Sequence, residues 1–170
     1  MSMQPGSFVW IELMTTDSKA AERFYQQVVG WHMVDAGMTP PYTLLMAGEA
    51  MVGGVMTLPP ELSAAGTPPC WTGYVGVDDV DAMAARVTAA GGSVCRPPED
   101  IPGIGRFAVV ADPHGAAFII FKGSGEPPAA TPAPGTPGIV GWHELHAGDG
   151  AKAFEFYSGL FGWTKTAAID

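Results

Sequence analysis

The sequence predicts an α+β fold built from paired βαβββ modules, followed by an incomplete third module. Short apolar runs with strand periodicity alternate with amphipathic helical stretches, and the order βαβββ occurs twice between residues 7 and 122. A further strand-and-helix pattern begins at residue 139 and repeats the start of the chain. Similarity at a long fixed offset indicates duplication of a domain, not a solenoid.

The first module covers about residues 7–58. Residues 8–15, FVWIELMT, alternate with the period of a strand. Asp17 stands where a helix N-cap belongs, and three strand-like runs beginning at Trp31, Tyr42 and Met51 follow the helix. The helix has apolar residues at helical spacing: Ala20, Ala21, Phe24, Tyr25 and Val28. The pair Gly53-Gly54 in the last run indicates a bulge or a close approach of backbone.

The second module covers about residues 70–122. It opens with the strand CWTGYVGV, and Asp79 then caps a predicted helix. The strand-like runs SVCR, GRFAVVA and AAFIIFK follow, the last after a turn at Asp112-Pro113-His114-Gly115. The predicted helix should bury four residues: Val80, Met83, Ala84 and Val87.

A third copy of the opening pattern follows a linker. Residues 142–163 repeat residues 10–31 with nine identities in twenty-two ungapped pairs. Residues 123–138 are rich in Pro, Gly and Ala and predict a semi-rigid linker. Residues 1–122 are therefore predicted to form a complete paired-module domain, and residues 139–170 the truncated start of a second domain of the same kind.

Composition limits the class of protein. The chain has 170 residues, an apolar share of 47% and a net charge of −9. Such a charge argues against nucleic acid and anionic membranes as partners. The absence of a signal peptide and of a long apolar run leads us to expect a cytoplasmic protein. Cys70 and Cys95 lie far apart without metal-ligand spacing, and we expect two buried thiols.

These modules and motifs resemble the vicinal oxygen chelate superfamily, which includes glyoxalase I, extradiol dioxygenases and bleomycin-resistance proteins. The resemblance rests on the element order, on WIELMTTD, FYQQVVGW, GWHELHAGD and FYSGLFGW, and on Asp-Pro-x-Gly before the last strand. The wording is similar to that of a subfamily of tandem glyoxalase-like proteins. The resemblance implies that the paired modules form a curved, cupped mixed sheet.

The superfamily's usual chemistry uses a divalent ion held by His, Gln or Glu side chains on the first and last strands of the modules. The resemblance places these ligand positions at Trp10, Thr72 and Ile119, and the closing strand of the first module has no ligand-type side chain. We therefore predict no metal site of the family type and no cofactor. His143 and His146 would face opposite sides of a strand and could not chelate together.

Strand alternation, applied to the implied cup, predicts a pocket for a small organic molecule. Its lining residues would be Trp10, Glu12, Met14, Thr72, Tyr74 and Ile119, opposite the residues that pack on the helices. We favour metal-independent binding in this aromatic cup. The alternative is an enzyme of the glyoxalase or dioxygenase type, with a displaced metal site or with Glu12 as general base. Glu12 could instead make a structural hydrogen bond or pair with a base such as Arg106.

The partial third module should expose the apolar face of its helix. We expect residues 139–170 either to form contacts between copies of the chain, giving a homo-oligomer, or to be poorly ordered.

Overall fold

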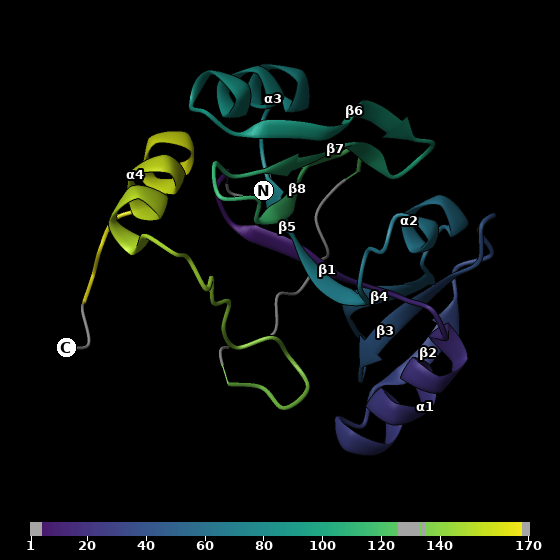
Figure 1. The fold of residues 1–170 in the computed structure, drawn as a ribbon. Helices are drawn as coiled ribbons and strands as arrows, with labels where there is room; N and C mark the ends of the chain where they lie inside the picture. Colours follow the sequence, from purple (N-terminus) through teal and green to yellow (C-terminus); the bar gives the residue numbers. More distant parts are fainter. Residues whose placement is uncertain (1–4, 126–132, 134, 168–170) are drawn as a thin grey trace. The chain divides into compact units, whose positions relative to one another are not determined.

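A computed structural model of the chain describes residues 5–125, 133 and 135–167. The chain forms two compact units. Trp10–Gly73 and Pro128–His143 form the first-module unit, and Met1–Val9, Tyr74–Pro127 and Glu144–Asp170 form the second-module unit. The predicted linker at 123–138 lies largely outside the described residues. Figure 1 shows the elements of both units in chain colours.

The first module has the predicted βαβββ order: β1 (Phe8–Thr15), α1 (Ser18–Val28), β2 (His32–Asp35), β3 (Tyr42–Ala47) and β4 (Ala50–Thr57). β1 runs parallel to β4, and β4–β3 and β3–β2 are antiparallel. Leu13, Leu45 and Val55 form a core with Trp31 on the helix side of these strands. Tyr25 of α1 packs against this core, as strand alternation from FVWIELMT predicts.

The second module repeats the order: β5 (Cys70–Gly76), α3 (Val80–Ala89), β6 (Ser93–Ile101), β7 (Gly105–Ala111) and β8 (Ala117–Gly123). β5 pairs with β8 in parallel, and the β8–β7 and β7–β6 pairs are antiparallel. The four residues predicted to be buried in α3 are all buried. Asp79 accepts the Ala82 backbone N–H at 2.9 Å, as Asp17 accepts that of Ala20, so both predicted N-caps are present. The α+β fold class and the paired βαβββ modules are confirmed.

The third copy differs from the prediction. Residues 139–147, all of them described, form no strand, although their sequence repeats that of β1. A strand is stable only when its backbone groups pair with neighbouring strands, and no such partner strand lies beside this segment. The helix of the copy does form, as α4 (Gly150–Phe161), with Asp149 as its N-cap.

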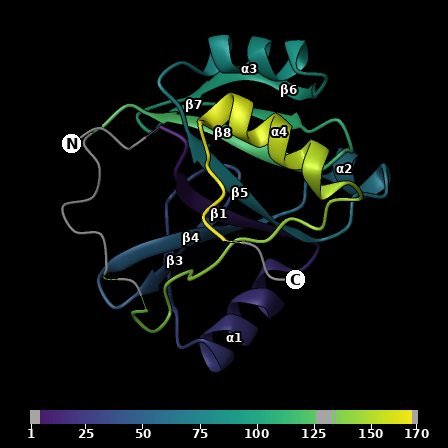
Figure 2. The same cartoon turned by 90° about the vertical axis from the view of Figure 1, so that its left-hand side faces the viewer.

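α4 packs within its own chain, where the sequence led us to expect contacts between copies or poor order. Phe156 and Leu160 enter the buried core formed by α3 and the strands β5, β7 and β8. Figure 2 shows α4 in yellow beside α3 and across these strands. The Tyr157 hydroxyl donates to the buried Asp112 carboxylate at 3.1 Å, which anchors the helix at the turn before β8. The apolar face of α4 is therefore covered without a second copy.

Three smaller features also departed from expectation. A short helix, α2 (Pro60–Ala64), forms in the Pro-rich segment between the modules. Cys70 is half-buried and Cys95 is exposed, so the expected burial of both thiols was wrong. Cys95 lies on the terminal strand β6, whose outer edge pairs with nothing else in the described sheet. In the part of the chain that the structure describes, no helix has the length and apolar character to span a bilayer.

Candidate functional site

Three side chains of the first-module unit form a hydrogen-bonded array on the strand face opposite the helix. The Trp10 indole N–H donates to the Tyr42 hydroxyl at 2.9 Å. The Tyr42 hydroxyl is in turn hydrogen-bonded to the Glu12 carboxyl. Glu12 is only 6% exposed, whereas Trp10 and Tyr42 are half-buried. The array thus places a buried carboxyl behind two aromatic side chains that still reach the surface.

The backbone of β4 explains why Tyr42 can reach Glu12. Glu12 pairs with Gly54 across the parallel β1–β4 ladder. The Tyr42 ring lies over Gly54, and a Cβ at that position would overlap the Tyr42 phenol. Gly53 similarly allows the close approach of Ile11, with its carbonyl oxygen 2.8 Å from the place of a Cβ. The glycine pair therefore marks a close approach of chains, one of the two interpretations that the sequence left open.

The electrostatics of the array follow from its burial. Desolvation, and next the neighbouring Glu12 carboxyl, raise the pKa of the Tyr42 phenol well above its ordinary value, because both disfavour a phenolate at this place. The Trp10 hydrogen bond acts in the opposite direction but is weaker. Tyr42 is therefore a neutral hydroxyl at neutral pH that donates to Glu12 and accepts from Trp10.

The other predicted lining residues lie in their expected strands. Met14 is on β1 in the first-module unit, and the buried Thr72, in the same unit, is on β5. Tyr74 and Ile119 belong to the second-module unit, where they are direct partners in the parallel β5–β8 pair and are both buried. Each unit thus brings together part of the predicted set, and the pocket formed by all six residues remains a prediction.

The structure adds Tyr42, which sequence reasoning missed. Tyr42 was recognised only as the start of a strand, because its contact with Glu12 depends on how β3 pairs with β4. The signal that could have found it is Gly54. A glycine in a strand leaves space above the backbone, and an aromatic residue on the adjacent strand can fill such a space.

The residues at the family's ligand positions do not fit a divalent ion. Trp10, Thr72 and Ile119 offer no strong donor, and the Trp10 N–H already binds Tyr42. Among the residues that the structure describes, no three His, Cys, Asp or Glu side chains cluster closely enough to hold a metal ion. The side chains at these positions therefore disagree with the metal site that the family resemblance implies.

Arg106 does not serve Glu12. Its guanidinium forms two hydrogen bonds to Asp81, at 2.7 and 2.8 Å, and one to Asp100, at 3.0 Å. These bonds raise the pKa of Arg106, and the guanidinium lowers the pKa of the Asp81 carboxyl. The structural role that the sequence allowed for Glu12 is instead a hydrogen bond from Tyr42.

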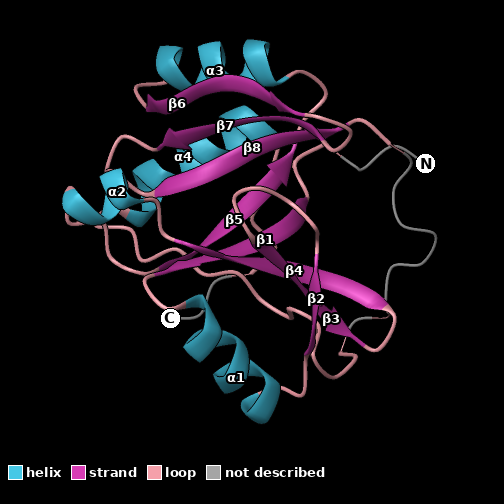
Figure 3. Ribbon diagram, turned by 90° about the vertical axis from the view of Figure 1, so that its right-hand side faces the viewer, coloured by secondary structure: helices cyan, strands magenta, loops and turns pink. Residues whose placement is uncertain are grey.

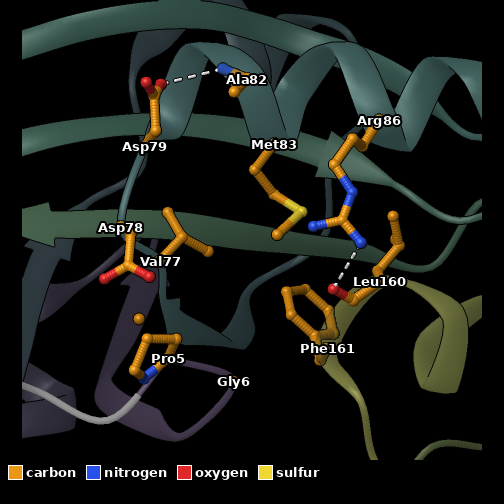
Figure 4. Close-up of a pocket in the computed structure, with 11 residues that line it drawn as sticks. Pro5, Gly6, Val77, Asp78, Asp79, Ala82, Met83, Arg86, Leu160 and Phe161 are labelled. Atoms are coloured by element: carbon orange, nitrogen blue, oxygen red, sulfur yellow. Dashed lines mark hydrogen bonds between the residues drawn. The ribbon is translucent and has the colours of Figure 1, made fainter.

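A cavity of about 210 Å³ lies elsewhere, in the second-module unit (Figure 4). It is enclosed by the start of α3, the end of β5 and the last turn of α4, and none of the six predicted ligand-binding residues lines it. Its polar groups are engaged: Asp79 caps α3, and Arg86 donates to the Leu160 carbonyl oxygen at 3.0 Å. The cavity results from the packing of α4 against α3, and we do not assign it as the functional site.

Comparison with known proteins agrees with the fold and the motifs. The family model described as "Glyoxalase/Bleomycin resistance protein/Dioxygenase superfamily" matches residues 7–120. The chain is 43% identical over 121 residues to "Putative glyoxylase CFP32" of Mycobacterium tuberculosis (strain CDC 1551 / Oshkosh), covering 70% of this chain and 45% of that protein. It is 36% identical over 171 residues to "Anthracycline biosynthesis protein DnrV" of Streptomyces peucetius, covering 93% of this chain and 61% of that protein.

This chain therefore spans about half to three fifths of the length of the curated relatives it matches. Among solved structures, a mutant of 4-hydroxymandelate synthase from Streptomyces coelicolor superposes with a TM-score of 0.62 at 21% identity, over 94% of this chain and 53% of that one. At this identity the likeness concerns the fold alone.

Proposed function

This chain belongs to the glyoxalase, bleomycin resistance protein and dioxygenase superfamily, and we propose that it binds a small organic molecule without a metal ion. One observation carries the proposal. Trp10 stands at the first-strand position where the family resemblance puts a metal ligand, and its N–H is held by Tyr42. An indole cannot coordinate a hard cation, but it offers a flat apolar surface for stacking.

The ligand class that we propose is a planar aromatic molecule with hydroxyl groups. Trp10 and Tyr42 are partly exposed aromatic side chains, and Glu12 behind them can accept hydrogen bonds. The relative named as an anthracycline biosynthesis protein, which matches 93% of this chain, supports a polycyclic aromatic ligand. The net charge of −9 favours a ligand that carries an amino group.

Calorimetric titration with doxorubicin, a water-soluble amino-substituted anthracycline, tests the proposal. We expect the same affinity with a chelator and with added manganese, and a loss of about tenfold in Trp10→Ala, because one aromatic contact contributes roughly 0.5–1.5 kcal/mol beyond its burial. Trp142→Ala is the matched control, since Trp142 is the equivalent residue of the third copy and is 80% exposed. Binding that requires metal, or equal losses in both variants, would contradict the proposal.

The second candidate is an enzyme of the glyoxalase type that uses Glu12 as a metal-free general base. The burial of Glu12 and its hydrogen bond to Tyr42 favour it, since a buried, oriented carboxyl suits proton abstraction. We would measure turnover of the hemithioacetal of methylglyoxal in the presence of a chelator. Loss of turnover in Glu12→Gln but not in Glu144→Gln, its equivalent in the third copy, would support catalysis. Stoichiometric metal in the purified protein would instead revive the displaced metal site.

A further inference from the structure

α1 and α4 are two copies of one helix, because each residue of α1 has its repeat partner 132 positions later in α4. Their internal aromatic geometry is the same. Phe24 and Tyr25 meet edge to face with centroids 5.1 Å apart, and so do Phe156 and Tyr157 at 5.1 Å. Any difference in burial between the two helices therefore comes from what surrounds them.

The surroundings of the two helices differ sharply. In α4, Phe156 is 7% exposed and Leu160 is 6% exposed, because both lie against α3 and the strands of the second module. Arg86 of α3 also donates to the carbonyl oxygens of Gly159 and Leu160, each at 3.0 Å (Figure 4). This face of α4 is thus a complete docking surface with apolar and polar contacts.

In α1 the equivalent residues are open. Phe24 is 55% exposed and Val28 is 65% exposed, although the sequence predicted them as part of an apolar helix face. Among the described elements, α1 contacts β4 and β2 but no other helix. In Figure 3 no further element of its unit lies against the outer side of α1. We call the surface of Phe24 and Val28 the outer face of α1.

A second relation links the two copies. The Trp163 indole N–H donates to the Gly6 carbonyl oxygen at 2.7 Å, and the Trp31 indole N–H donates to the Gly138 carbonyl oxygen at 2.7 Å. Gly138 is the repeat partner of Gly6, as Trp163 is of Trp31. Each copy therefore binds the leading glycine of the other. Such reciprocity is the mark of a two-fold relation, in which every contact of one copy has its equivalent in the other.

From this broken symmetry we propose that the outer face of α1 docks onto a further βαβββ module, whose sheet and helix present a surface like that of α3 with β5, β7 and β8. The occupant needs an apolar, β-branched sheet face to receive Phe24 and Val28, as the second module provides for α4. Relatives of this chain have room for such a module, since the match covers 61% of the anthracycline relative and 45% of CFP32. This surface is independent of the ligand site around Glu12.

The first test asks whether the outer face of α1 complements such a module. Residues 150–161 are replaced by residues 18–29, which puts Phe24 and Val28 in the places of Phe156 and Leu160. Hydrogen exchange of this helix should stay within about tenfold of the original chain, with the control change Phe156→Arg accelerating it well beyond that. A grafted helix that exchanges as fast as Phe156→Arg overturns the proposal.

The second test asks which partner covers α1. The chain is extended after Asp170 by a Gly/Ser linker and a second copy of residues 59–123. Exchange of residues 20–28 should slow at least tenfold, and Phe24→Arg should abolish the slowing while Phe154→Arg, at another exposed helical phenylalanine, should not. Unchanged exchange of α1, whether or not the added module is protected, overturns the proposal. So does protection that already appears in the original chain on dimerisation, because a second copy is then the occupant.

Discussion

Phe24 and Phe156 allow one prediction to be made from a matched pair, because they occupy the same position in two copies of a helix and differ in surroundings. Phe156→Ala removes a side chain that is 7% exposed in the core of the second-module unit, a change that costs about 3–5 kcal/mol in well-packed proteins. Phe24→Ala removes one that is 55% exposed, so we expect a cost below about 1 kcal/mol.

The two costs appear in different observables. α4 can undock without unfolding the strands, so the loss in Phe156→Ala is limited by the free energy of docking. We expect the urea midpoint to fall and exchange in α4 to quicken about a hundredfold, which corresponds to roughly 3 kcal/mol at 1.36 kcal/mol per factor of ten. In Phe24→Ala both should remain close to the original. Equal effects of the two variants would refute the assignment of buried and open helix faces.

Three further predictions concern single contacts. Gly54→Ala should cost about 1–3 kcal/mol, because its Cβ overlaps the Tyr42 phenol, and a urea titration should show this cost vanish in a Tyr42→Ala background. Burial, and next the Asp112 carboxylate, raise the pKa of Tyr157, so its contribution to stability is complete below the ordinary phenol pKa near 10 and is lost as pH rises above it. Tyr157→Phe should therefore lose less stability than the original chain between neutral and strongly alkaline pH; an identical loss would count against it. Asp79→Ala removes the cap of α3 and should cost about 1 kcal/mol by thermal denaturation, whereas no change would show that the N-terminus of α3 finds other acceptors.

Features that depend on local sequence were the ones that could be predicted. Alternation along β1 and β5 separates Leu13 and Val75, which pack on the helix side, from Glu12 and Tyr74 on the other side. The buried residues of α3 follow from helical spacing, and the N-caps follow from Asp at the start of each helix. Register and partner could not be predicted in the same way. The Tyr42 contact with Glu12 depends on how two strands pair, and the exposure of Phe24 depends on what covers a helix.

The repeated segment separates these two kinds of information within one sequence. Residues 10–31 and 142–163 share their motif, yet WIELMTTD forms β1 while WHELHAGD forms no strand, and the helix that follows forms in both copies. A helix closes its hydrogen bonds within four residues and carries its own cap, here Asp17 or Asp149. A strand closes none of its ladder bonds alone and needs a neighbour of matching register.

The helix is therefore the part of the module that survives without the rest, and it keeps an apolar face that must find a sheet. α4 finds that sheet in the second module, where Phe156 is buried. The outer face of α1 has the equivalent apolar residues without such a sheet among the described elements. Because an open apolar face of this kind is costly in water, it marks the place where the architecture of the paired modules continues.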